Sequence, residues 1–231
     1  QTLSGDGQLL LVSGEPGIGK TRLLREMTTH VDVTGGLTLV GESHFGGSAP
    51  YDAFTQIVHK GLEHASSNDI EISEFILADL LTLVPEFHTK YPDIPTNPPL
   101  DPESEHRRLM ENLAVFIGTL AEQTSLLLAI DDAHWADSGT LAMLQHLVRR
   151  CNKKRVMILI TYREVELDEA LPFHETILAL GREASPFRIK LSRFTEKQTH
   201  HLLETIFAEE ITPEFLSAIY RETEGNPFFI E

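Results

Sequence analysis

The chain has 231 residues, of which 41% are hydrophobic, so it is longer than one average domain and has enough apolar content for a sizeable core. Its 35 acidic residues outnumber its 19 basic residues, and the formal net charge of −16 argues against a dedicated nucleic-acid-binding surface. Cys151 is the single cysteine, which excludes an intramolecular disulfide and favours a reducing, cytoplasmic setting. No segment is apolar enough to span a membrane, so no membrane partner is expected.

A strand at Gln8–Ser13 and a helix at 20–30 are the first elements expected, with a glycine-rich loop between them. The loop matches G-x-x-x-x-G-K-[ST] at every fixed position, and its residues are Gly14, Glu15, Pro16, Gly17, Ile18, Gly19, Lys20 and Thr21. Glycines let successive N–H groups form an anion-binding nest, to which the start of the helix adds its positive dipole. We expect Lys20 to reach the β- and γ-phosphates of a nucleotide and Thr21 to ligate Mg²⁺. The flanking strand and helix disfavour a chance match in an ordinary turn.

Aliphatic runs alternate with helical patterns along the rest of the first 193 residues. Further strands are expected at Leu37–Glu42, 125–131, Val156–Tyr162 and 187–191. Helices are expected at 54–64, at 73–84, from Glu103 onward, from Asp137 or Ser138 to Arg150, and at 173–182. Residues 91–102 carry five prolines and are expected to form an extended surface loop. Strands without alternating polarity, separated by helices, predict an α/β fold with a five-stranded parallel sheet covered on both faces.

Only helical patterns appear from Thr195 onward. Thr195 and Gln198 form a predicted capping box for a helix at Glu196–Phe207, and a second helix is expected at Pro213–Thr223. We therefore expect residues 1–193 to form the α/β core and residues 194–231 to form an incomplete helical lid. Both ends are expected to continue in a longer parent protein.

Two acidic residues follow the aliphatic run at 125–130. Asp131 and Asp132 should lie at the carboxyl edge of the sheet, where open α/β folds bind ligands. Asp131 is expected to hold Mg²⁺, and Asp132 to orient or deprotonate the attacking water. Taken alone, the pair could be a strand end with a helix cap, and the upstream phosphate loop favours the functional interpretation.

An arginine and a proline complete the predicted site. Arg163 follows another buried strand at the same edge and is expected to contact the γ-phosphate; the alternative is a surface arginine paired with Glu164 or Glu166. Near the end of the chain, Gly225 stops a helix, and Asn226 caps the next helix with Pro227 at its first position. The functional interpretation adds that the Pro227 ring packs on the adenine base.

The motifs at 14–23, 131–137, 161–164 and 224–229 occur in an order and spacing that resemble the nucleotide-binding core of STAND ATPases, signalling relatives of the AAA+ class. The chain is most similar to the module of large LuxR-type bacterial regulators and soluble adenylyl-cyclase-like proteins, over nearly its whole length. The resemblance implies Lys20 and Thr21 as the Walker A pair, Asp131 and Asp132 as the Walker B pair, Arg163 as the sensor, Pro227 on the adenine side, and Arg22 within the nucleotide-binding loop. Relatives carry a Gly-Arg-Glu-type segment before the first strand and a winged-helix domain after the last motif.

Five further residues have two interpretations each. His134 and Trp135 directly follow the acidic pair and could touch the site, although a loop histidine and a packing tryptophan are the safer interpretations. Arg182 lies where AAA+ proteins place a trans-acting arginine finger, and Arg149 and Arg150 are further candidates. The favoured interpretation of all three is that a cation at the end of a helix complements the helix dipole.

The expected function is an ATP- and ADP-binding switch module that uses Mg²⁺ and hydrolyses ATP slowly, inside a multidomain signalling or transcription-regulatory protein. Its expected partners are nucleotide and the other domains of the parent chain. Self-association of the chain that depends on the bound nucleotide is also possible. A motor or loader AAA+ ATPase acting on DNA or protein and a non-hydrolysing nucleotide-binding scaffold are the alternatives, and a small-molecule kinase is the least favoured.

Overall fold

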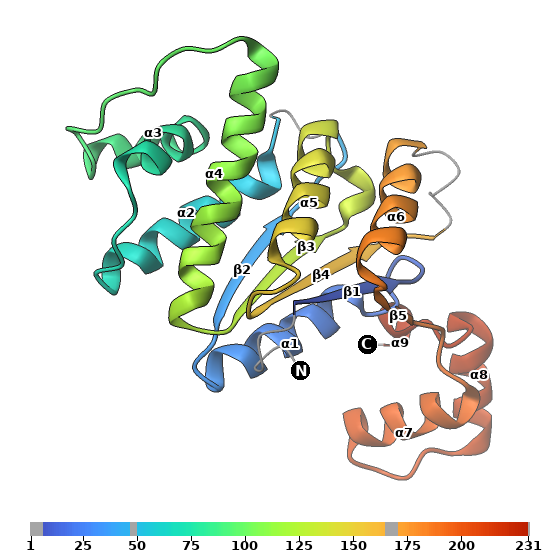
Figure 1. The fold of residues 1–231 in the computed structure, drawn as a ribbon. Helices are drawn as coiled ribbons and strands as arrows, with labels where there is room; N and C mark the ends of the chain where they lie inside the picture. Colours follow the sequence, from blue (N-terminus) through green and yellow to red (C-terminus); the bar gives the residue numbers. More distant parts are fainter. Residues whose placement is uncertain (1–6, 47–49, 165–170, 231) are drawn as a thin grey trace.

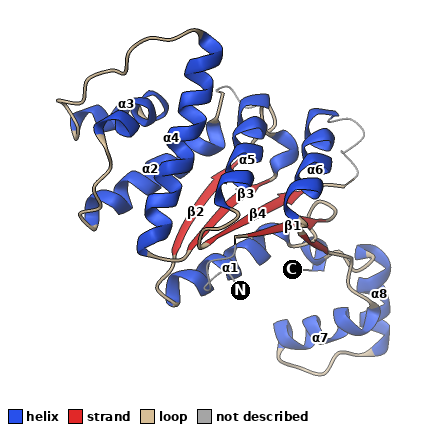
Figure 2. Ribbon diagram, viewed as in Figure 1, coloured by secondary structure: helices blue, strands red, loops and turns tan. Residues whose placement is uncertain are grey.

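Five strands form one sheet in a computed structural model that describes residues 7–46, 50–164 and 171–230. The strands are β1 (Gln8–Ser13), β2 (Leu37–Glu42), β3 (Leu126–Asp131), β4 (Val156–Tyr162) and β5 (Phe187–Lys190). They lie in the order β2-β3-β4-β1-β5, and every pair is parallel (Figures 1 and 2). The predicted α/β fold with a five-stranded parallel sheet is confirmed.

The helices agree with the predicted pattern and extend it by a few residues. They are α1 (Lys20–Val33), α2 (Asp52–Ser67), α3 (Glu74–Leu83), α4 (Pro102–Gln123), α5 (Ser138–Cys151), α6 (Leu171–Ala184), α7 (Glu196–Phe207), α8 (Pro213–Thr223) and α9 (Pro227–Ile230). Two short 3₁₀ helices, η2 (Pro85–Thr89) and η3 (Ala133–Trp135), were not predicted. No helix within the described residues is long and apolar enough to cross a membrane.

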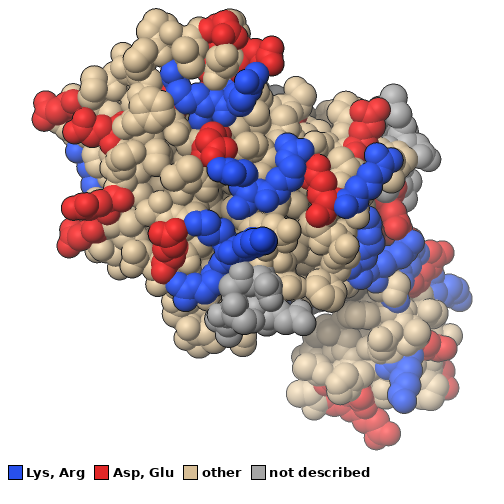
Figure 3. Space-filling view, viewed as in Figure 1, with Lys and Arg blue, Asp and Glu red and all other residues tan. Residues whose placement is uncertain are grey.

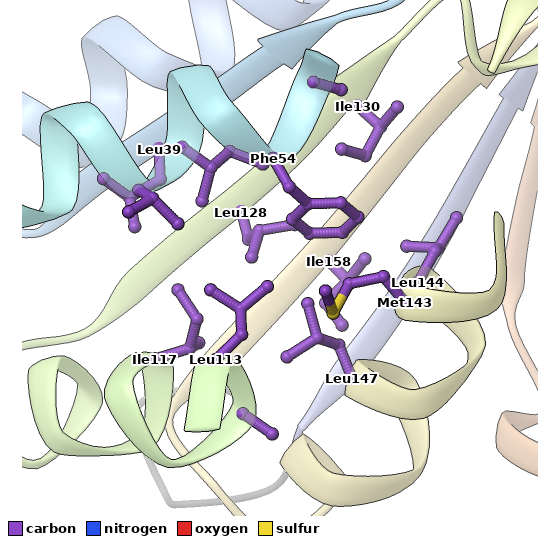
Figure 4. Close-up of a cluster of buried hydrophobic side chains, with 14 of the residues drawn as sticks. Leu39, Phe54, Leu113, Ile117, Leu128, Ile130, Met143, Leu144, Leu147 and Ile158 are labelled. Carbon is purple, nitrogen blue, oxygen red and sulfur yellow. The ribbon is translucent and has the colours of Figure 1, made fainter. Parts of the chain in front are cut away.

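Successive residues of each central strand pack against opposite faces of the sheet. Leu9 and Leu11 of β1 belong to a large cluster with side chains of α2, α4, α5 and α6, part of which Figure 4 shows. Leu10 and Val12 belong to a smaller cluster with Leu24 of α1, which lies on the opposite face in Figure 1. Both faces are apolar because both are covered, and this explains the absence of alternating polarity in these strands.

The edge strand β5 differs from the expectation that the sheet is covered on both faces. All four of its residues are exposed, including Phe187 at 58% and Ile189 at 40%. β5 pairs only with β1 and has no second neighbour in the strand order. The apolar residues of this short run therefore lie at an edge of the sheet.

The proline-rich segment before α4 contains no helix or strand between residues 92 and 101, as predicted. It is anchored by Asp79 of α3, a carboxylate whose residue is only 5% exposed. Asn97 of the segment donates to Asp79 Oδ1 at 2.8 Å, while Arg108 Nε and Asn112 Nδ2 of α4 donate to Oδ2 at 2.9 and 2.8 Å. A buried carboxylate needs such partners, and these bonds fix α3, α4 and the segment together.

The C-terminal helices α7, α8 and α9 lie beyond β5, on the side away from α2, α3 and α4 (Figure 1). The predicted capping box is present, because the Gln198 N–H donates to Thr195 Oγ1 at 3.3 Å and the Thr195 N–H donates to Gln198 Oε1 at 2.8 Å. The Leu191 N–H donates to the Ser13 carbonyl oxygen at 2.8 Å, where the chain leaves the sheet. The segment that leads into α7 therefore starts beside the end of β1, next to the phosphate loop.

Candidate functional site

A pocket of about 280 Å³ opens at the carboxyl edge of the sheet. It is lined by residues from the predicted motifs, namely Pro16, Gly17, Gly19, Lys20, Thr21, Arg22, Asp132, Arg163, Pro227 and Phe228. β1, β3 and β4 are parallel neighbours, so the loops that follow them meet at one edge. The structure thus brings together residues that are up to 212 positions apart in the sequence, from Pro16 to Phe228.

The phosphate loop has a backbone that requires glycine at two positions. Gly17 has φ of 74° and Gly19 has φ of 103°, both in the left-handed region that side chains disfavour. Gly19 is also the N-cap of α1 and provides no side-chain cap to the first turn. The start of α1 borders the pocket, so the positive end of its helix dipole would favour an anion bound there.

The Lys20 side chain lies inside the loop, and the residue is only 6% exposed. Its Nζ donates to the carbonyl oxygens of Gly14 and Glu15, at 3.0 Å each. Two partners of this ammonium are therefore neutral carbonyls of the phosphate loop. An anion in the pocket would offer a stronger, charge-assisted acceptor.

Asp131 connects the phosphate loop to the centre of the sheet. Thr21 Oγ1 donates to Asp131 Oδ2 at 2.9 Å, and Thr161 Oγ1 of β4 donates to Asp131 Oδ1. The backbone N–H of Asp132 donates to the same Thr161 oxygen at 2.9 Å. Thr161 is the first residue of the motif at 161–164, but the sequence assigned it no role in the site. Its signal there is a hydroxyl near the end of an aliphatic strand.

Asp132 adopts a left-handed backbone conformation, with φ of 49° and ψ of 43°. Its side chain is 35% exposed and borders the pocket. His134 Nδ1 lies 3.9 Å from Asp132 Oδ1, and the His134 side chain is fully buried. Its ring also contacts Trp135, with ring centroids 4.7 Å apart. His134 therefore contacts a site residue and is a buried packing residue as well.

Arg163 forms part of the pocket wall. Its guanidinium carbon lies 5.8 Å from the centroid of the Trp135 ring, within the range of a cation–π interaction. Glu164, one partner in the alternative interpretation, forms an ion pair with Lys190. Glu166 lies outside the described residues. Arg163 thus borders the pocket and lies within cation–π range of Trp135.

The turn between α8 and α9 packs on the phosphate loop. Asn226 Nδ2 donates to the Pro16 carbonyl oxygen at 3.1 Å, and Asn226 Oδ1 accepts the Phe228 N–H at 3.1 Å, as predicted for a helix cap. A Cβ atom at Gly17 would lie 2.7 Å from Phe228 Cβ, so only glycine allows this close approach. Pro227 lines the pocket beside these contacts.

The other candidate arginines lie on a different surface. Lys and Arg side chains gather over α4 and α5 in Figure 3, interspersed with acidic side chains. Arg149 pairs with Glu183 at 3.1 Å, and Arg150 pairs with Glu111. Within the described part of the chain, neither these two arginines nor Arg182 lines the pocket. For any of these three arginines to act as an arginine finger, a second molecule would have to present it to this pocket.

The chain is similar to several solved structures. A STAND protein with a tetratricopeptide repeat sensor from Pyrococcus horikoshii shares 17% identity at a TM-score of 0.49, over 97% of this chain and 26% of that protein. A Drosophila ORC chain, solved in a complex with DNA, shares 15% identity at a TM-score of 0.41, over 84% and 86% of the two chains. PCH-2 of C. elegans shares 17% identity at a TM-score of 0.40, over 87% and 39%. The chain thus spans about a quarter of the length of the STAND protein.

No curated protein matches the chain. The sequence does match a family model. The model described as the AAA ATPase domain matches residues 1–160, which include the phosphate loop, both acidic residues and most of the sheet. Because this match spans more than half of the 231 residues, the chain belongs to the AAA ATPase domain family, which confirms the predicted P-loop AAA+ core.

Proposed function

We propose that the chain binds ATP and ADP with Mg²⁺, hydrolyses ATP slowly, and acts as a switch module in a multidomain signalling or transcription-regulatory protein of the STAND type. The observation that carries this proposal is the hydrogen bond from Thr21 to Asp131, which joins the phosphate loop to the acidic pair across 110 positions of sequence. Nucleotide use by an ATPase domain follows from the family. The switch role, the residue roles and the division into core and lid are parts of the proposal.

Lys20 would bind the β- and γ-phosphates. A buried ammonium is costly unless its N–H groups have good acceptors, and phosphate oxygens are stronger acceptors than the carbonyls of Gly14 and Glu15 that it contacts. The N-terminus of α1 would add its dipole to the same phosphates. Residues 14–22, including Arg22, would enclose them.

Thr21 and Asp131 would hold the metal ion. Their oxygen atoms are 2.9 Å apart, and hydroxyl and carboxylate oxygens are the hard ligands that Mg²⁺ prefers. Mg²⁺, when bound, would neutralise charge on the phosphates. Asp132 would then orient the attacking water and accept its proton, because its carboxylate borders the pocket and is partly open to it.

Arg163 and the α8–α9 turn would make the site a switch. Arg163 would contact the γ-phosphate, which ATP has and ADP lacks, while Pro227 would pack on the adenine base. The turn already contacts the phosphate loop through Asn226, so a change at the phosphates could be transmitted to residues 194–231 and to other domains of the parent protein. Self-association in one nucleotide state is a further part of this proposal.

Calorimetric titration of Lys20→Ala with Mg²⁺-ATP and Mg²⁺-ADP tests the proposal. The change removes the cation of the phosphate loop, so both nucleotides should lose detectable binding. Lys154→Ala is the matched control, because Lys154 is a surface lysine whose Nζ pairs with Glu122 at 2.9 Å. Wild-type affinity in Lys20→Ala would refute the assignment of this pocket as the nucleotide site.

A further inference from the structure

Thr161 is a polar side chain with 0% exposure, located one residue before the end of the central strand β4. Its hydroxyl is the acceptor for the Asp132 N–H at 2.9 Å and the donor to Asp131 Oδ1. A backbone N–H can only donate and an ionised carboxylate can only accept, so the direction of both bonds is fixed. One hydroxyl thus connects the backbone of one acidic residue to the carboxylate of the other.

The Asp131 carboxylate is held from two sides. Thr161 donates to Oδ1 from β4, and Thr21 donates to Oδ2 at 2.9 Å from the first turn of α1. A carboxylate with one hydrogen bond can rotate about its Cβ–Cγ bond, whereas bonds to both oxygens fix the plane of the group. Thr161 therefore determines the orientation in which Asp131 presents Oδ2 to the phosphate loop.

Thr161 also acts on the backbone of Asp132. Asp132 has φ of 49°, a left-handed conformation that L-residues rarely adopt without support. The hydrogen bond from its N–H to Thr161 ties this residue to β4 at the point where the chain turns into η3. The direction in which the Asp132 side chain enters the pocket depends on this turn.

We propose that Thr161 is a positioning residue that aligns Asp131 and Asp132 relative to the phosphate loop. This inference rests on the proposed ATPase function, in which the two acids hold Mg²⁺ and activate water. Thr161 does not line the pocket, so it acts through the two aspartates. Its hydroxyl, and not its volume, is the required feature.

The test compares Thr161→Val, which keeps the shape and removes the hydroxyl, with Thr161→Ser, which keeps the hydroxyl. Thr38→Val is the matched control, because Thr38 is a 2% exposed strand residue whose hydroxyl donates to Asp32 at 2.8 Å, away from the pocket. Two quantities are measured on the full chain: the gain in ADP affinity that Mg²⁺ produces, by calorimetry, and kcat and KM for ATP. The first measurement does not depend on turnover.

Thr161→Val should lose most of the Mg²⁺-dependent gain in ADP affinity and reduce kcat about 10- to 100-fold, as expected for the loss of a hydrogen bond to a charged group. ADP affinity without Mg²⁺ and KM for ATP should stay within about twofold of wild type, because Lys20 and the loop are unchanged. Thr161→Ser and Thr38→Val should resemble wild type. Should Thr161→Val fail to fold, Thr161→Ala provides the same loss of the hydroxyl without added bulk.

Two results would overturn the role of Thr161. One is wild-type Mg²⁺ dependence and kcat in Thr161→Val, and the other is equal damage in Thr161→Ser, which would show that packing is the cause. The proposed function fails by a different result, namely the absence of nucleotide binding by the wild-type chain. If the wild-type chain binds no nucleotide, the proposed function fails. If wild type binds nucleotide but the Thr161 variants do not behave as expected, only the role of Thr161 fails.

Discussion

Arg193 Nε lies 2.8 Å from Glu15 Oε2, and the same guanidinium also pairs with Glu224 through Nη1. One side chain therefore connects the phosphate loop, the segment after β5 and the turn before α9. These hydrogen bonds, the one to Glu15 first, raise the pKa of Arg193 above its usual value. The Arg193 side chain is 39% exposed, so water and salt screen both pairs.

Arg193→Gln should loosen residues 194–230 from the core without unfolding the sheet. We expect amide exchange in α8 and α9 to become about two- to fivefold faster, the size expected for an exposed ion pair, and the difference to vanish in 1 M salt. Lys190→Gln is the control, because Lys190 forms an exposed pair with Glu164 on the core. Equal effects of the two substitutions would show that Arg193 has no special role in holding residues 194–230 against the core.

Asp132→Asn should retain nucleotide binding and lose turnover. Asparagine tolerates the left-handed conformation of this position as well as aspartate does, so the backbone should be preserved. A carboxamide cannot accept the proton of water, and the loss of a general base typically costs about 10²- to 10⁴-fold in rate. Single-turnover phosphate release measures this step, and release at the wild-type rate would exclude Asp132 as the base.

Arg163→Ala should weaken ATP binding more than ADP binding. A hydrogen bond between charged groups is worth about 1.5–3 kcal/mol, so the ATP-to-ADP affinity ratio should fall about 10- to 100-fold. Paired titrations with ADP and a non-hydrolysable ATP analogue measure the ratio. Arg155→Ala is the control, because Arg155 precedes β4 at the opposite edge of the sheet and donates to the Glu122 carbonyl. An unchanged ratio in Arg163→Ala would contradict its role as a γ-phosphate sensor.

Gly225→Ala should disrupt the turn that contacts the phosphate loop. Gly225 has φ of 76°, and a Cβ atom there would lie 2.0 Å from the Phe194 carbonyl oxygen. Gly35→Ala has a similar φ of 80° but open space around the new Cβ, so it should cost only about 1 kcal/mol of stability. Limited proteolysis after residue 194 should increase in Gly225→Ala alone. Equal sensitivity of the two variants would attribute the effect to backbone strain instead of the close approach.

Cys151 should resist thiol reagents in the native protein. Burial raises the pKa of its thiol from 9.0 to about 11, so at pH 8 only about one thiol in 1,000 is the reactive thiolate. The unfolded thiol ionises first, so this group should lower the stability of the protein as the pH rises from about 9 toward 11. Labelling with a chromogenic disulfide reagent, with and without denaturant, measures this protection; fast labelling of the native chain would contradict it.

The sequence by itself determined the elements and most of the candidate site. Aliphatic runs are long enough to identify β1, β3 and β4, and the phosphate loop is a contiguous pattern whose glycines meet a local backbone requirement. The two acids and Arg163 were found because parallel strands place their carboxyl ends at one edge, which is a rule of topology. The cap at Asn226 is likewise a local feature of the chain.

Only the tertiary structure decided the contacts that join these elements. In sequence, Thr161 belongs to the motif at 161–164 but has no assigned role, and it bridges the two acids because β4 lies beside β3 in the strand order. Arg193 meets Glu15 across 178 positions because β5 lies beside β1. The exposure of β5 likewise depends on its place at the edge. Such relationships depend on which strands become neighbours and on where each chain segment returns to the sheet, and neither is encoded in a local pattern of residues.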